Sequence, residues 1–239
     1  MARFLFTVWP FPGHVHPNIA IAHALHERGH EVAFYTGSEA RAVVEGEGFR
    51  CFPCEQIDEA RLYRIMFSQR HSSMPWKHPF RLVTVLREWL LETIPQQVTD
   101  LQAVMATWQP DVVVSDVTFW GPFLVLHETC RVPVAVSSFV PGCMVPGPDA
   151  PPWGLGLPRP RNWHTRLLAR LVGAATDLLA MDFRRTASAL RKRYGLLPLS
   201  MPVHGFLGQM PLYLVPSVPE FDYARRDLPS SVHYVGSLV

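Results

Sequence analysis

The sequence predicts an α/β domain built on a Rossmann-like parallel sheet with helices on both faces. Short apolar runs of strand length alternate with helix-length segments from residue 4 to 52, and again from residue 111 to 137. Such alternation is typical of parallel sheets. Of the 239 residues, 48% are hydrophobic and 18% charged, so the chain can bury the core that such a sheet requires.

The first part of the sheet is predicted from a strand–helix–strand–helix–strand unit. Its elements are strand 4–9, helix 17–28, strand 31–36, helix 39–45 and strand 49–52. Pro12 and Gly13 are expected to break the chain after the first strand. Pro17 suits the first turn of the helix, and Gly29 suits its C-terminal cap.

The rest of the chain continues the pattern with longer interruptions. Residues 58–108 are predicted to be helical with breaks at prolines, and a proline- and glycine-rich loop spans about 140–160. A loop of that length inside a compact domain points to a functional segment. The remaining predicted elements are strand 111–115, helix 119–130, strand 133–137, helix 163–194 with leucines along one face, and strands 212–215 and 232–235.

Composition excludes several classes of protein. A net charge of +2 argues against a nucleic-acid-binding surface. No apolar run reaches the length of a membrane span, and residues 1–9 lack the features of a signal peptide. Four cysteines do not make a disulfide framework, and Cys51 and Cys54 lack the helix N-terminus of a redox motif. We expect a cytoplasmic protein.

His14 and Asp116 are the predicted chemical centre. His14 follows the first strand, at the carboxyl edge where open α/β sheets bind ligands. Asp116 closes the strand that Asp111 opens, so only Asp116 shares this edge. A carboxylate on one ring nitrogen fixes the tautomer and stabilises the cation formed when the other nitrogen takes a proton. This pairing predicts a general base.

Each of these residues has a plainer interpretation. His14 could cap its helix, and Asp116 could be the N-cap of the helix beginning near residue 119. His16 is a rival base or metal ligand, but it lacks a clear third ligand; we expect no metal site. Ser137 and Ser138 could bind the donor or simply satisfy their own loop.

The order of motifs resembles a known family. Gly13-His14-x-x-Pro17 leading to Arg28-Gly29-His30-Glu31-Val32 is similar to the opening of nucleotide-sugar-dependent glycosyltransferases, including plant UDP-glycosyltransferases and bacterial macrolide glycosyltransferases. Residues 110–116, 133–139 and 221–236 resemble, in order, later segments of the N-terminal domain of these enzymes. The likeness therefore extends along essentially the whole chain.

The resemblance implies a fold and a reaction. Residues 1–239 would form the N-terminal, acceptor-binding half of a GT-B fold, with the C-terminal nucleotide-sugar-binding domain absent. His14, oriented by Asp116, would deprotonate an acceptor hydroxyl during inverting transfer from a UDP- or TDP-type sugar. No cofactor is implied, and the donor would bind through the missing domain.

An apolar acceptor pocket is predicted from residues near the same edge. We expect a natural-product-like acceptor there. The predicted binding residues are Phe11, Gly13, Trp76, Phe119, Ser137, Ser138, Phe139 and Met144.

Two other classes of protein stay open. A non-catalytic binding module could keep this fold; retention of both His14 and Asp116 disfavours it. A dinucleotide-dependent enzyme is disfavoured because the three-glycine fingerprint is missing.

Overall fold

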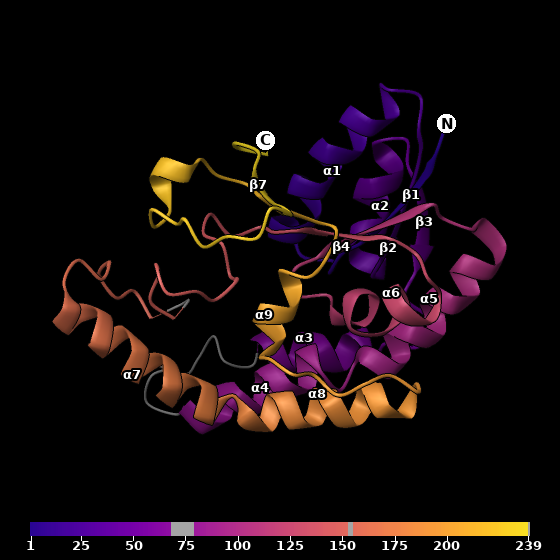
Figure 1. Ribbon diagram of the computed structural model, residues 1–239. Helices are drawn as coiled ribbons and strands as arrows, with labels where there is room; N and C mark the ends of the chain where they lie inside the picture. Colours follow the sequence, from indigo (N-terminus) through magenta and orange to yellow (C-terminus); the bar gives the residue numbers. More distant parts are fainter. Residues whose placement is uncertain (68–78, 153–154, 239) are drawn as a thin grey trace.

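The computed structural model describes residues 1–67, 79–152 and 155–238 (Figure 1). These residues form a seven-stranded sheet of order β3-β2-β1-β4-β5-β6-β7, in which all neighbouring strands are parallel. The predicted Rossmann-like parallel sheet is thus confirmed. The strands are β1 (Arg3–Thr7), β2 (Glu31–Thr36), β3 (Arg50–Pro53), β4 (Val112–Asp116), β5 (Val134–Ser137), β6 (Leu212–Val215) and β7 (Val232–Tyr234).

The strand order places a switch point between β1 and β4. From β1 the chain builds outward through β2 to β3, then returns to β4 and builds outward in the other direction. The two loops that leave the carboxyl ends of β1 and β4 therefore diverge. A crevice at such a point is where open α/β sheets bind their ligands.

Helices cover both faces of the sheet (Figure 1). On one face, α1 (Pro12–His26) and α2 (Ser38–Gly46) pack on a core that includes Phe6, Phe34 and Val114. The larger core, on the other face, includes Leu5, Tyr35 and Val113. Its covering elements are α3 (Glu59–Phe67), α4 (Pro79–Leu90), α5 (Ile94–Trp108), a π-helical turn (Pro122–Leu126), α8 (Met181–Arg193) and α9 (Val203–Leu207). The short α6 (His127–Thr129) follows the π-helical turn and buries none of its residues.

The start of the first helix differs from the prediction. Helix α1 begins at Pro12, five residues before the predicted start, and runs through Pro17. A proline inside a helix clashes with the carbonyl four residues earlier and leaves that carbonyl unbonded. Here that residue is Gly13, which is exposed, so water can hydrogen-bond to its carbonyl. The expected chain break at Gly13 is therefore wrong, whereas Gly29 does adopt the left-handed conformation of a helix cap, with φ of +81°.

Two later helices also depart from the prediction. The segment expected as one helix over 163–194 is divided at Ala180 into α7 (Trp163–Leu179) and α8. The helix expected over 119–130 contains the π-helical turn Pro122–Leu126. Between β5 and α7 the described residues form no helix or strand, as predicted for the long loop. In the described part of the chain, no helix combines the length and apolarity needed to cross a membrane.

Candidate active site

The switch point brings His14 and Asp116 together. His14 lies in the first turn of α1, and a helical side chain leans toward the N-terminal end of its helix. It therefore points back toward the ends of the strands. Asp116 is the last residue of β4. Its side chain projects from the same sheet face as that of Val114, two residues earlier, which packs against α1.

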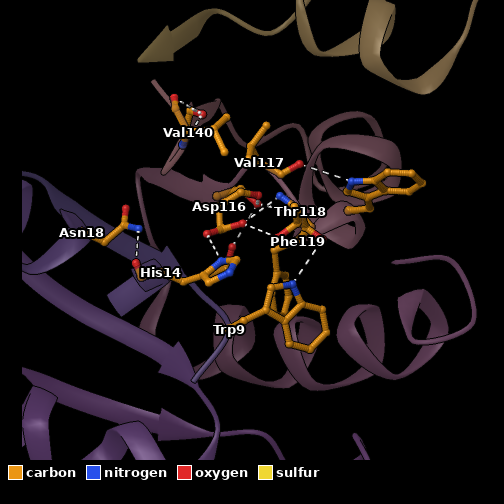
Figure 2. A network of polar contacts seen from close by, with 12 residues as sticks. Trp9, His14, Asn18, Asp116, Val117, Thr118, Phe119 and Val140 are labelled. Carbon is orange, nitrogen blue, oxygen red and sulfur yellow. Dashed lines mark hydrogen bonds and ion pairs between the residues drawn. The ribbon is translucent and has the colours of Figure 1, made fainter. Parts of the chain in front are cut away.

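The two side chains form a buried pair. His14 Nδ1 lies 2.7 Å from Asp116 Oδ2 (Figure 2). The side chain of His14 is 10% exposed and that of Asp116 is 0% exposed. In the arrangement that suits a base, Nδ1–H donates a hydrogen bond to the carboxylate, and the Nε2 lone pair is left available to accept a proton. Within the described chain, Nε2 has no hydrogen-bond partner, so the arrangement can remove a proton from a bound molecule.

Two further residues, which the sequence analysis did not predict, form hydrogen bonds to this pair. Thr118 donates to Asp116 Oδ1 twice, from its backbone N–H at 2.7 Å and from Oγ1 at 2.6 Å. Asn18 Nδ2 donates to the backbone carbonyl of His14 at 2.8 Å (Figure 2). A short Asp-x-Thr segment after a strand is a local signal for the first contact. The second follows from the four-residue spacing on a helix.

Aromatic rings surround the imidazole. The ring centroid of Phe139 lies 4.0 Å from that of His14, and those of Phe11 and Trp89 lie 5.7 and 6.3 Å away. Phe11 and Phe139 were expected near the site, whereas Trp89 was not. These rings restrict rotation of the imidazole and exclude water around it, which strengthens its contact with the Asp116 carboxylate.

The other predicted binding residues have different environments. Ser137 is fully buried, and its hydroxyl has no hydrogen-bond partner among the described residues. The Ser138 hydroxyl bonds within its own loop, to the backbone of Val140. Phe119 is fully buried between Trp9 and Tyr35, in the core below the site. Trp76 lies outside the described residues.

Met144 lines an open cavity whose lining contains neither His14 nor Asp116. The cavity has a volume of about 410 Å³ and begins at Pro141, two residues after Phe139. Its walls come from the loop that follows β5 and from residues 221–225, which follow β6. The lining is rich in proline and includes Met144, Phe221 and Tyr223, with Asp222 and Arg225 as its charged members. A volume of this size suits a small organic ligand.

A network of polar contacts fixes the shape of this cavity. Arg225 forms a two-pronged ion pair with Asp227 and donates to the carbonyl of Val145 at 2.9 Å. The Asp222 carboxylate accepts from the backbone N–H of Cys143 at 2.8 Å and from the Tyr234 hydroxyl at 2.7 Å. The loop after β5 is thus tied to the segment after β6.

The rival sequence features show no comparable arrangement. His16 is exposed on α1. Cys51 and Cys54 are free thiols; burial raises the pKa of Cys51 to about 11 and also raises the pKa of Cys54. Among the described residues, no three His, Cys, Asp or Glu side chains gather as metal ligands would.

Comparison with known proteins gives relatives of one kind, although no protein-family model matches the sequence. The chain is 34% identical over 244 aligned positions to 4'-demethylrebeccamycin synthase of Lentzea aerocolonigenes; the alignment covers 100% of this chain and 56% of that protein. The chain therefore spans about half the length of this relative.

Solved structures share the fold. A glycosyltransferase of kitacinnamycin superposes with a TM-score of 0.64 at 15% identity, covering 99% of this chain and 51% of that one. The spinosyn rhamnosyltransferase SpnG, solved with thymidine diphosphate and with spinosyn aglycone, gives a TM-score of 0.57 at 19% identity. These alignments cover 98% of this chain and 49% and 50% of SpnG.

Fold and site together define an α/β protein with a histidine–carboxylate pair at the switch point of a parallel sheet. The chain is related to the GT-B glycosyltransferases of natural-product biosynthesis, as its motifs predicted. It corresponds to about half of such a protein.

Proposed function

We propose that this chain is the N-terminal, acceptor-binding half of an inverting glycosyltransferase, with His14 as the general base. The observation that carries the proposal is the 2.7 Å contact between His14 Nδ1 and the fully buried carboxylate of Asp116. This contact directs the Nε2 lone pair away from the carboxylate.

The reaction that we propose is a single displacement. The acceptor hydroxyl gives its proton to His14 Nε2 while its oxygen bonds to the anomeric carbon of the donor sugar. The bond from that carbon to the nucleoside diphosphate breaks, and the diphosphate leaves with the bonding electrons. Attack opposite the leaving group inverts the anomeric centre. Asp116 stabilises the imidazolium, and base catalysis of this kind contributes roughly 10²–10⁴-fold.

The acceptor is proposed to be an apolar small molecule of the natural-product type. The support is the proline-, methionine- and aromatic-lined cavity that begins two residues beyond Phe139. SpnG, a neighbour in fold, has been solved with an aglycone. We propose that Phe11, Phe139 and Met144 contact such a molecule, because the first two rings lie beside the imidazole and Met144 lines the cavity.

The donor is proposed to be a nucleotide sugar of UDP or TDP type. SpnG has also been solved with thymidine diphosphate. We propose that most donor contacts come from a second, nucleotide-binding half, so this chain alone binds the donor weakly and turns over little. The scheme uses no cofactor, because the nucleoside diphosphate is itself a good leaving group.

The proposal is tested by supplying the second half of a relative, in trans or by fusion, and measuring sugar transfer. We expect His14→Ala and Asp116→Asn each to lower kcat by roughly 10²-fold or more. His16→Ala is the matched control, because it removes an exposed imidazole two residues away on the same helix. Full activity of His14→Ala would exclude the mechanism.

A non-catalytic binding module remains the second candidate. It predicts that acceptor binding occurs without transfer in every reconstituted assembly. Calorimetry on the chain alone adds a separate check. Micromolar binding of nucleotide sugar to this half would contradict the proposal that the second half makes most of the donor contacts.

A further inference from the structure

Helix α7 presents an apolar face to solvent. Leu167, Leu168, Leu171 and Leu178 are 49–65% exposed, and Trp163 is 66% exposed. The helix lies at the edge of the molecule and contacts α8, which follows it in the chain (Figure 1). Isolated exposed leucines are ordinary, but a contiguous row of them on one helix marks an interaction surface.

Four exposed side chains in this row have the spacing with which one helix packs along another, and we call these four residues the seam. Leu167, Leu171, Ala174 and Leu178 follow one another at intervals of four, three and four residues, and all four are exposed. This alternation is the a/d pattern by which one helix packs along another. The opposite side of α7, which includes Ala169, Val172 and Thr176, is the side that is partly buried.

Charged residues flank the seam on one side. Arg170 precedes Leu171, and Asp177 precedes Leu178, so both occupy the position next to the seam that contacts a partner helix. Both are exposed, and neither forms an ion pair within the described part of the chain. The two charges are opposite and are separated by one seam repeat.

We propose that the occupant of this face is the α7 of a second copy of the chain, packed antiparallel across a two-fold axis. In that arrangement Leu171 of each copy faces Ala174 of the other, and Leu167 faces Leu178. Arg170 of each copy then meets Asp177 of the other, so the same ion pair forms twice. A parallel pairing would instead place Arg170 beside the uncharged Ala175.

The size of the seam sets the strength of the dimer. Seventeen residues span about 25 Å of helix, and the seam offers only a few large side chains. Such a contact falls at or below the low end of stable interfaces, which bury roughly 1,200–2,000 Å² in total. We therefore expect reversible association at micromolar concentrations rather than a permanent dimer.

The experiment is sedimentation equilibrium of the chain over about 1–200 µM, a range suited to weak association. The mass should rise from 27.1 kDa toward twice that value. Leu171→Asp should abolish the rise. Arg170→Asp and Asp177→Arg should each weaken association about tenfold or more, because each replaces two attractions by two repulsions. Arg166→Asp, on α7 but away from the seam, should change little.

The double variant Arg170→Asp/Asp177→Arg decides the geometry. It recreates both ion pairs with exchanged signs, so it should restore the dimerisation constant of the original chain, an outcome that misfolding cannot produce. Circular dichroism should show unchanged helix content in every variant. A monomer at all concentrations, or a double variant no better than the single ones, overturns the proposal. The proposal is also overturned if the original chain stays monomeric and binds anionic vesicles, and Leu171→Asp loses that binding. This result would assign the face to a membrane surface.

Discussion

Thr118 holds the carboxylate of Asp116 from the side opposite His14. Its backbone N–H and its hydroxyl both donate to Oδ1, at 2.7 and 2.6 Å, while Oδ2 receives the imidazole. The carboxylate therefore has its plane set by three donors. Because a base acts only from the right orientation, Thr118 is a positioning residue for the proposed reaction.

Thr118→Val should lower kcat of a reconstituted enzyme about tenfold, because a hydrogen bond to a charged group contributes roughly 1.5–3 kcal/mol. The backbone donor stays, so the loss should be smaller than for Asp116→Asn. Thr118→Ser keeps the hydroxyl and should recover most of the rate. If the serine variant is as slow as the valine variant, the hydroxyl is not what positions the carboxylate.

The sequence was sufficient to predict the sheet and the central pair. Strands 31–36 and 212–215 matched the structure because apolar runs between turn residues mark strands clearly. His14 and Asp116 could be paired because parallel strands bring their carboxyl ends to one edge. That argument depends on topology alone and needs no side-chain detail.

Other features depended on contacts that the sequence does not reveal. Pro17 was taken for the first turn of a helix that in fact starts at Pro12 and contains Pro17 in its interior. The leucines of α7 have the periodicity of a core-facing helix, yet they face solvent. Periodicity shows that an apolar face exists, but only the packing shows what covers it.

Replacing Gly121 and Gly46 by alanine should change the free energy of unfolding in opposite directions. A Cβ at Gly121 would lie 2.7 Å from Gln97 Oε1 and 2.9 Å from Gln97 Cβ, and Gln97 is fully buried. Gly121→Ala should therefore destabilise the fold by about 1–3 kcal/mol through overpacking. Gly46, in α2, has open space around its Cβ position, so Gly46→Ala should stabilise by about 0.4–1 kcal/mol. Urea denaturation measures both; equal effects would contradict the packing described at Gly121.

Arg191 should be a strong determinant of stability. Its buried guanidinium donates to the carbonyls of Leu124 and Leu197 at 2.6 and 2.8 Å, and to Glu128 at 2.8 Å. It thereby joins α8 to the π-helical turn. Arg191→Ala should cost about 3 kcal/mol, because it leaves buried carbonyls without donors.

Arg193→Ala provides the control on the same helix, since Arg193 is exposed. It should change the free energy of unfolding by less than about 0.5 kcal/mol. Similar denaturation midpoints for the two arginine variants would show that the contacts of Arg191 add no net stability.

His204 should make stability depend on pH. Burial lowers the pKa of its imidazole below the usual value, and the ring lies edge-on to that of Trp120. In the unfolded chain the imidazole regains an ordinary pKa of about 6.5. As the pH falls through that value, the unfolded state takes up the proton more readily than the folded state, so stability falls. Above it, both states are neutral and this dependence disappears.

The difference between His204→Gln and the original chain isolates this effect, since both keep every other titrating group. Between pH 8 and pH 5.5 the original chain should lose more stability than the glutamine variant, measured as the free energy of unfolding in urea. His16→Gln, at an exposed imidazole, should follow the original chain. A His204→Gln variant that loses stability equally on acidification would mean that the imidazole of His204 is as readily protonated in the folded protein as in the unfolded chain.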